Sequence, residues 1–249
     1  MPRYFLEVAY KGTAYSGLQS QKNANTIQQE IENALSVLLN SRITLVCSSR
    51  TDAGVHALQN FFHFDIPFPF KRDKLYNANA ILPKDILVRN IYGVNENAHC
   101  RFDAVSREYK YFIYQKKDPF LFEKAFYYPF KLDIDLLQKA ASIVIEYNDF
   151  ESFSKRKTQV KSFQCSIQKS HWYFDNDCLV YNVVANRFLR GMVKGLVGTM
   201  LKVGRNIVST EEFKNIIESK NCRNADFSPL SQGLFLTAVK YPDGLISDL

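Results

Sequence analysis

Residues 50–56 (RTDAGVH) place one carboxylate, Asp52, two residues after Arg50 and two before Gly54. Strand-like stretches flank this segment at 43–47 and 60–66, so we expect Asp52 at the tip of a loop, where catalytic groups are common. A neighbouring guanidinium favours the ionised, nucleophilic form of a carboxylate. Glycine reaches backbone conformations that are costly for other residues. The alternative is a solvated Asp-Gly-type turn, which is the commoner environment of such residues.

A second group of candidate side chains is basic and lies on or near one stripe of a helix predicted over 188–203. The group consists of Arg187, Arg190, Lys194, Lys202 and Arg205. Such a row could bind phosphates, with one member paired to Asp52. The alternative is a solvated basic face, which is usual for a surface helix.

The polar stretch 154–162 predicts a mobile loop, and it adds basic residues that could touch RNA. These are Lys155, Arg156 and Lys157. Tyr109 and Tyr111 lie on the same side of a predicted strand. One of them could stack on an extruded base, and the alternative is a cross-strand aromatic pair within the sheet.

The sequence predicts neither a metal nor a cofactor. His56 and His63 flank the Asp52 loop, and a metal-dependent hydrolase built on these three residues is the alternative that we keep open. The other histidines, His99 and His171, lie far away in the sequence, and no Cys-x-x-Cys pair occurs. The glycines of 191–198 fit helix packing rather than a dinucleotide-binding loop.

The composition points to a cytoplasmic protein with an anionic partner. The chain has 249 residues and a net charge of +7, which makes nucleic acid the leading candidate for that partner. The five cysteines are scattered and odd in number, as is typical of reduced thiols in the cytoplasm. The N-terminus lacks the apolar stretch of a signal peptide, and no apolar run is long enough to span a bilayer.

The elements that must position these residues follow a repeated plan. The first half reads as strand, helix, strand, strand, helix and strand, over 4–10, a helix capped by Thr26, 43–47, 60–66, 71–82 and 86–92. The second half predicts strands and helices over 109–114, 132–147, 164–174, 178–185, 188–203 and 234–241. We therefore expect an α+β protein of two split βαβ halves, ferredoxin- or RRM-like, over 1–103 and 104–249. The halves are expected to share one continuous antiparallel sheet with the helices on one side.

Four motifs occur in an order that resembles the tRNA pseudouridine synthase A family. The most specific is the Asp loop, 50–56. The others are 10–12 (YKG) with 17–19 (GLQ), 99–104 (HCRFDA) with 107–111 (REYKY), and 186–194 (NRFLRGMVK) followed by Gly198. The resemblance covers nearly the whole chain.

The resemblance implies two α+β halves with a basic cleft between them and a homodimer that binds the anticodon stem-loop of transfer RNA. The implied reaction converts uridine to pseudouridine at positions 38–40 without a cofactor or metal. Two rival hypotheses remain. The chain could be a relative that acts on another RNA site, or a catalytically silent RNA-binding protein on the same scaffold.

The resemblance also implies roles for individual residues. Asp52 matches the catalytic nucleophile, and Arg50 matches the arginine that helps to extrude the base. Tyr109 matches the tyrosine that stacks on the target ring. Lys194 matches a basic partner of the aspartate, where most relatives carry arginine. Leu18 stands where the family usually has tryptophan, so we expect that surface to pack or touch RNA differently.

Overall fold

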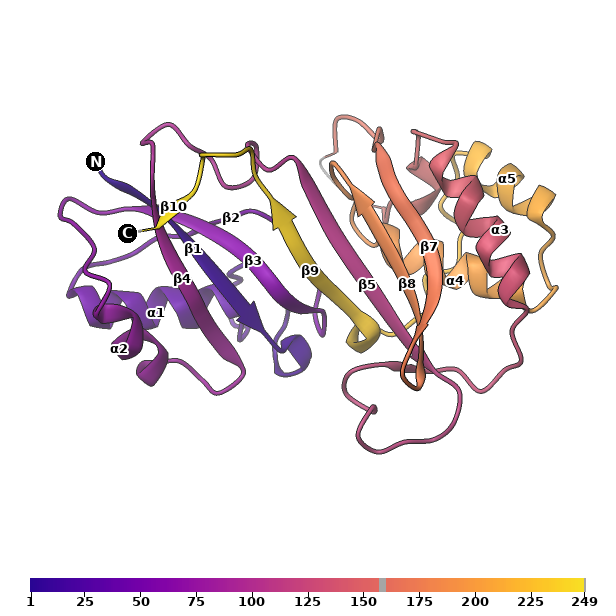
Figure 1. Cartoon of the computed structure of the whole chain (residues 1–249), viewed down its shortest axis with the longest axis horizontal. Coiled ribbons are helices and arrows are strands. Elements are labelled where there is room, and N and C mark those ends of the chain that lie inside the picture. Colours follow the sequence, from indigo (N-terminus) through magenta and orange to yellow (C-terminus); the bar gives the residue numbers. More distant parts are fainter. Residues whose placement is uncertain (157–159, 249) are drawn as a thin grey trace. The chain divides into compact units, whose positions relative to one another are not determined.

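The computed structural model describes residues 1–156 and 160–248, and these form two compact units. The first unit contains Met1–Val105 together with the chain from Phe235 onward, and the second contains Ser106–Leu234 (Figure 1). Helices and mostly antiparallel strands occur in both units, which confirms the α+β class. The halves predicted at 1–103 and 104–249 differ from this grouping because the last strands of the chain pair within the first unit.

The sheet of the first unit has the strand order β10-β4-β1-β3-β9, with β2 also paired to β3. β1 lies antiparallel to both β3 and β4. β9 is parallel to β3, so the expectation of a wholly antiparallel sheet is wrong for this pair of strands. The strands are β1 (Arg3–Tyr10), β2 (Val46–Cys47), β3 (His56–Asp65), β4 (Ile86–Val94), β9 (Leu234–Lys240) and β10 (Ser247–Asp248).

Two helices and a 3-10 turn complete the first unit: α1 (Ile27–Leu39), α2 (Lys74–Ile81) and η1 (Gly12–Ala14). Thr26 caps α1 as predicted, because its hydroxyl accepts a hydrogen bond from the Gln29 backbone N–H at 3.4 Å. The helix ends at Asn40, which takes the left-handed conformation with φ of 48°. Ile27, Ile31 and other apolar residues of α1 are buried, so the apolar stripe of this helix forms part of the core.

The second unit contains an antiparallel sheet with the order β5-β8-β7 and a short β6 paired to β5. Its strands are β5 (Ser106–Tyr114), β6 (Phe126–Tyr127), β7 (Ile167–Asp175) and β8 (Cys178–Ala185). The strands predicted over 164–174 and 178–185 form an antiparallel hairpin, β7 and β8, and its turn residue Asn176 has a φ of 51°. Asparagine tolerates this left-handed conformation better than most residues.

The helices of the second unit are α3 (Ile134–Ile145), α4 (Met192–Gly204) and α5 (Thr210–Glu218), with 3-10 turns η2 (Glu151–Phe153) and η3 (Ser231–Gly233). α3 packs against β7 and also contacts α4 and α5 (Figure 1). The buried side chains of α4 include Leu196, Val197 and Met200. None of the helices in the described part of the chain combines the length and the apolar character needed to cross a membrane.

Two predicted elements start or end elsewhere. The strand expected over 43–47 is reduced to Val46–Cys47. The helix expected over 188–203 begins only at Met192, because Gly191 takes a left-handed conformation with φ of 78° and interrupts the helical path. Arg187 and Arg190 therefore precede α4 rather than lying on its face, and the predicted helical row of cations is wrong for these two residues.

Candidate active site

The Asp52 loop connects β2 to β3 and is closed by a tight turn. The Val55 backbone N–H donates to the Asp52 carbonyl at 3.2 Å. Gly54 has a φ of 79°, which confirms that this position uses a conformation favoured by glycine. Asp52 is half-buried, whereas Thr51 beside it is buried. The carboxylate is thus carried by a backbone whose shape is fixed on both sides.

A buried hydrogen-bond network holds the start of this loop. Asn60 donates from Nδ2 to the Ser49 carbonyl at 2.9 Å and to the Tyr10 hydroxyl at 3.2 Å. Because Tyr10 accepts that bond, its own proton can go to Thr51 Oγ1, which lies 2.8 Å away. Between Ala57 and Asn60, β3 has a bulge opposite β1. Bulges re-aim side chains and are common next to active sites.

The motif at 10–12 and 17–19 packs beside the Asp52 loop. The Leu18 N–H donates to the Thr51 carbonyl at 3.0 Å. A Cβ at Gly12 would lie only 2.0 Å from the Val55 carbonyl oxygen, so no other residue fits there without movement of the backbone. The Gly12 N–H donates to His56 Nδ1 at 3.1 Å. Leu18, expected on a surface that packs or touches RNA differently from that of relatives, is fully buried, and its backbone contacts the Asp loop.

Arg50 is exposed and hydrogen-bonds the thiol of Cys47, at the end of β2. Burial raises the pKa of the Cys47 thiol, and the nearby guanidinium groups of Arg50 and Arg101 oppose that rise. Arg50 is thus anchored near the base of the loop, with the charged end of its side chain available to an anion.

Tyr109 lies on β5, and its ring meets the Phe188 ring edge-on, with centroids 4.9 Å apart. Only 8% of Tyr109 is exposed, so little of its ring is open to a base in this conformation. Phe188 belongs to the segment between β8 and α4 that also carries Arg187 and Arg190. This segment is held by Arg107, which donates from Nη1 to the Asn186 carbonyl at 2.8 Å.

Part of the predicted basic loop meets this same segment. The Lys155 N–H donates to the Arg190 carbonyl at 2.9 Å, and a Cβ at Gly191 would lie 2.9 Å from Lys155 Cγ. The structure therefore brings Lys155 and Arg190 together. Arg156 is exposed, whereas Lys157, also predicted to bind RNA, lies outside the described residues.

Two further predicted residues lie on or just after α4. Lys194 is half-buried, and its Nζ donates to Ser231 Oγ at 3.4 Å. Arg205 ends the helix, and its guanidinium lies 3.9 Å from the centroid of the Phe130 ring. That cation–π contact gives Arg205 a structural role in the second unit in addition to the predicted one.

The histidines do not form the site required by the hydrolase alternative. His56 accepts from Gly12 and stacks on Phe235, with ring centroids 4.5 Å apart. His63 contacts Cys100 instead, so these two histidines contact different groups of residues.

Comparison with known proteins decides the family. A model described as tRNA pseudouridine synthase matches residues 146–242. The chain is 43% identical to tRNA pseudouridine synthase A of Parabacteroides distasonis over 98% of both chains. It is 41% identical to the protein of that name from Azobacteroides pseudotrichonymphae over the whole of both chains, and 35% identical to one from Staphylococcus aureus over 95% of this chain and 91% of the relative.

The chain belongs to the tRNA pseudouridine synthase A family. Pseudouridine synthases are isomerases, and this membership confirms the resemblance found in the sequence. The residues of the family motifs are divided between the two units of the structure. Arg50 and Asp52 belong to the first unit, and Tyr109, Lys194 and the other predicted basic residues belong to the second.

The structure adds supporting residues that the sequence analysis did not assign to the loop. Tyr10, Asn60 and His56 hold the Asp52 loop by hydrogen bonds. Tyr10 and Gly12 were noticed as part of a motif, but nothing in their spacing showed that they contact a loop some forty residues later. Asn60, on the strand that follows the loop, gave no sequence signal, because burial cannot be read from its residue type.

Proposed function

We propose that this protein isomerises uridine to pseudouridine in the anticodon stem-loop of transfer RNA, at positions 38–40, with Asp52 as the nucleophile. The observation that supports the nucleophile is the loop itself. A half-buried carboxylate is carried between a glycine turn and a buried Tyr10–Thr51–Asn60 network. A solvated surface turn needs no such support, whereas a catalytic group must be held in one geometry.

In the proposed reaction the Asp52 carboxylate forms a covalent bond to the target nucleoside, at the sugar or at the base. The bond between N1 of uracil and C1′ of ribose breaks, the uracil turns, and C5 bonds to C1′. The bond from the Asp52 carboxylate to the nucleoside breaks, which returns the carboxylate to its starting form. C5 then loses its proton, and N1 gains one, so the reaction is balanced without an oxidant, a reductant or a second substrate. This balance agrees with the expectation that no cofactor takes part.

The remaining roles follow the family resemblance. Arg50 helps to extrude the base and holds its place in the helix. Tyr109 stacks on the target ring, and Lys194 supplies positive charge to the nucleophile. Phosphate contacts come from Arg187, Arg190, Lys155, Arg156, Lys157 and Arg205. The backbone contact between Lys155 and Arg190 supports a phosphate-binding surface, because it brings together two segments that each carry basic residues.

We further propose that each unit is a split βαβ, that the protein acts as a cytoplasmic homodimer, and that a basic cleft receives the RNA. The order β4-β1-β3, with β2 on β3 and with helices in both crossovers, supports the motif in the first unit. Light scattering of the purified protein at micromolar concentration tests the dimer, and a monomer mass would contradict it.

The decisive test uses transfer RNA labelled with tritium at C5 of uridine, because the reaction releases that hydrogen. Asp52→Asn should lower the release rate by on the order of 10³-fold or more, whereas its transfer RNA affinity should stay within about threefold of wild type. Asp177→Asn is the matched control, because it removes an exposed carboxylate from the β7–β8 turn.

Two outcomes would overturn the proposal. Wild-type tritium release from Asp52→Asn would exclude Asp52 as the nucleophile. Tight binding of transfer RNA by the wild-type protein, without any tritium release, would support the silent RNA-binding protein instead. Lys194→Ala should slow the release without loss of folding, and an unchanged rate would remove Lys194 from the mechanism.

A further inference from the structure

A compact group of metal-ligating side chains lies in the first unit: His63 on β3, and His99 and Cys100 in the turn between β4 and β5. One ligand atom from each of the three lies within 4.8 Å of the other two. Cys100 is fully buried, His63 is nearly so, and His99 is half-buried. The rings of the two histidines meet edge-on with centroids 4.6 Å apart.

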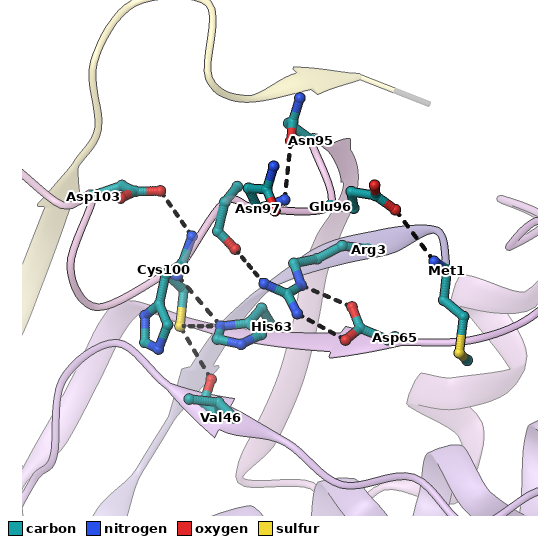
Figure 2. Close-up of polar contacts among 12 residues, drawn as sticks. Met1, Arg3, Val46, His63, Asp65, Asn95, Glu96, Asn97, Cys100 and Asp103 are labelled. Atoms are coloured by element: carbon teal, nitrogen blue, oxygen red, sulfur yellow. Dashed lines mark hydrogen bonds and ion pairs between the residues drawn. The ribbon is translucent and has the colours of Figure 1, made fainter.

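The closest contact within this group joins a thiol and an imidazole nitrogen. Cys100 Sγ lies 3.2 Å from His63 Nδ1 and 3.1 Å from the Val46 carbonyl oxygen, as Figure 2 shows. The Cys100 backbone N–H also points to His63 Nδ1, at 3.3 Å. The tautomer of His63 decides whether Nδ1 accepts from the thiol or donates to it. In either case a sulfur and a ring nitrogen, both metal-ligating atoms, lie in direct contact in a buried place.

We propose that His63, His99 and Cys100 bind a zinc ion. Two imidazole nitrogens and a thiolate form a donor set that suits zinc better than it suits calcium or magnesium. In a tetrahedral zinc site the ligand atoms lie about 3.3–3.7 Å apart, given Zn–N near 2.0 Å and Zn–S near 2.3 Å. Binding would require the three donors to move closer than the 4.8 Å within which they lie, and a water molecule would complete the fourth position.

The backbone around the three ligands is already fixed. The His99 N–H donates to Asp103 Oδ2 at 2.7 Å, and the Arg101 N–H donates to His99 Nδ1 at 3.2 Å, which leaves His99 Nε2 as the ligand. Arg3 holds the preceding residue by donating from Nη1 to the Ala98 carbonyl at 2.9 Å. The same guanidinium forks onto Asp65, two residues from His63, at 2.7 and 2.8 Å (Figure 2). Such outer contacts orient metal ligands.

The proposed ion is structural and takes no part in isomerisation. When it binds, a Zn–S bond and two Zn–N bonds form, the Cys100 thiol gives one proton to the buffer, and nothing is oxidised or reduced. The ion ties β3 to the turn after β4, segments that are some forty residues apart in the chain. Its expected effect is therefore on stability and not on the chemical step.

The test uses the full-length protein stripped with a chelator and then titrated with Zn²⁺ alone, or with Co²⁺ as a spectroscopic substitute. We expect one equivalent of tightly bound metal, a Co²⁺–thiolate absorption band in the near ultraviolet, and a higher Tm with Zn²⁺. Cys100→Ser should abolish the band and weaken Zn²⁺ binding at least 100-fold, and His99→Gln should weaken it about tenfold or more. Cys222→Ser is the matched control, because that thiol is not in the group, and it should bind as wild type does.

The proposal would be overturned if the wild-type protein bound Zn²⁺ no more tightly than with micromolar affinity. Retention of the cobalt band by Cys100→Ser would overturn it as well, since the thiolate would then come from another cysteine. If Cys100→Ser does not fold, His99→Gln still tests the site, because His99 is half-buried and glutamine preserves its polarity. Wild-type Zn²⁺ affinity in a folded His99→Gln protein would also contradict the site. Tritium release is not needed for any of these outcomes, so the zinc site and the isomerase activity stand or fall separately.

Discussion

At the scale of single residues, the Asp52 loop depends on groups that do not react. Tyr10 and Asn60 make hydrogen bonds that are entirely buried, and an unmet buried donor or acceptor costs about 1–3 kcal/mol. Gly12 permits a backbone approach that any side chain would block. These neighbours fix the loop before RNA arrives, so little ordering is left for the bound state.

Gly54→Ala tests the conformation of the loop. An alanine at φ of 79° should lower the free energy of unfolding by about 1–2 kcal/mol and slow tritium release by about tenfold, because the turn that carries Asp52 must shift. Thermal unfolding and single-turnover kinetics measure the two effects.

Gly244→Ala is the control for that variant. Gly244 has a φ of 78°, and a Cβ there would meet no atom within 4 Å. It should therefore lose a similar amount of stability while the rate of isomerisation stays at the wild-type value. Equal rates for both alanine variants would show that the Gly54 turn does not position the carboxylate.

Tyr109 offers a test of stacking. Tyr109→Phe keeps an aromatic face and should bind transfer RNA within about twofold of wild type, whereas Tyr109→Leu should lose about 1–3 kcal/mol of binding. Fluorescence anisotropy with an anticodon stem-loop measures both. Because Phe188 packs on the Tyr109 ring, each variant needs an unfolding curve to separate binding from packing. Equal binding by both variants would refute the stacking role.

At the scale of the residue, the sequence predicts the reactive groups well. It predicts the groups that support them less well. Asp52 and Gly54 stand in a local motif, and the positive φ of Gly54 was foreseen from residue type alone. Asn60 and His63 carry no local pattern, and the motif that contains Cys100 does not show what its thiol contacts, because the partners of these residues come from other segments of the chain. Such partnerships depend on strand register, and one residue of bulge changes which side chain meets which.

At the scale of elements, hydrophobic periodicity located the helices and long strands, and it misplaced their ends where backbone conformation decides. α4 has the apolar pattern expected from 188 onward, but Gly191 delays its start to Met192. The apolar spacing could not predict this start, because it carries no information about the sign of φ at Gly191. β2 is short for a related reason: only Val46 and Cys47 pair with β3, although the apolar run is longer.

Gly198→Ala tests the packing of α4 on the segment after α5. Alanine favours helix, yet its Cβ would lie 2.2 Å from the Asp226 carbonyl oxygen. We expect a loss of about 3 kcal/mol or more, measured by denaturant unfolding, because backbone must move.

Lys202→Ala provides the comparison on the same helix. It removes the ion pair of Lys202 Nζ with Asp226 at 3.2 Å, and 41% of the lysine side chain is exposed. Exposed pairs contribute about 0–1 kcal/mol, so this variant should remain close to wild type. A larger loss from Lys202→Ala than from Gly198→Ala would show that the ion pair, and not the close approach, holds the segment.

At the scale of the whole molecule, the charge of +7 should appear in the salt dependence of RNA binding. The logarithm of the affinity should fall linearly with the logarithm of salt concentration, and Arg190→Gln should make the slope shallower by about one unit. Lys214→Gln on α5 is the control and should leave the slope unchanged. A flat salt response of the wild-type protein would contradict phosphate recognition by this basic surface.

The pairing of β9 with β3 has a consequence for the newly made chain. Translation delivers residues 106–234 before β9, the strand that pairs with β3, so His56 and Ala57 lack their partners Phe235 and Leu236 until those residues have been made. Until then the backbone at the base of the Asp52 loop has an open edge, and His56 lacks the ring on which it stacks. A polypeptide released early by the ribosome would thus carry every motif of the enzyme and still lack the scaffold that aims its carboxylate.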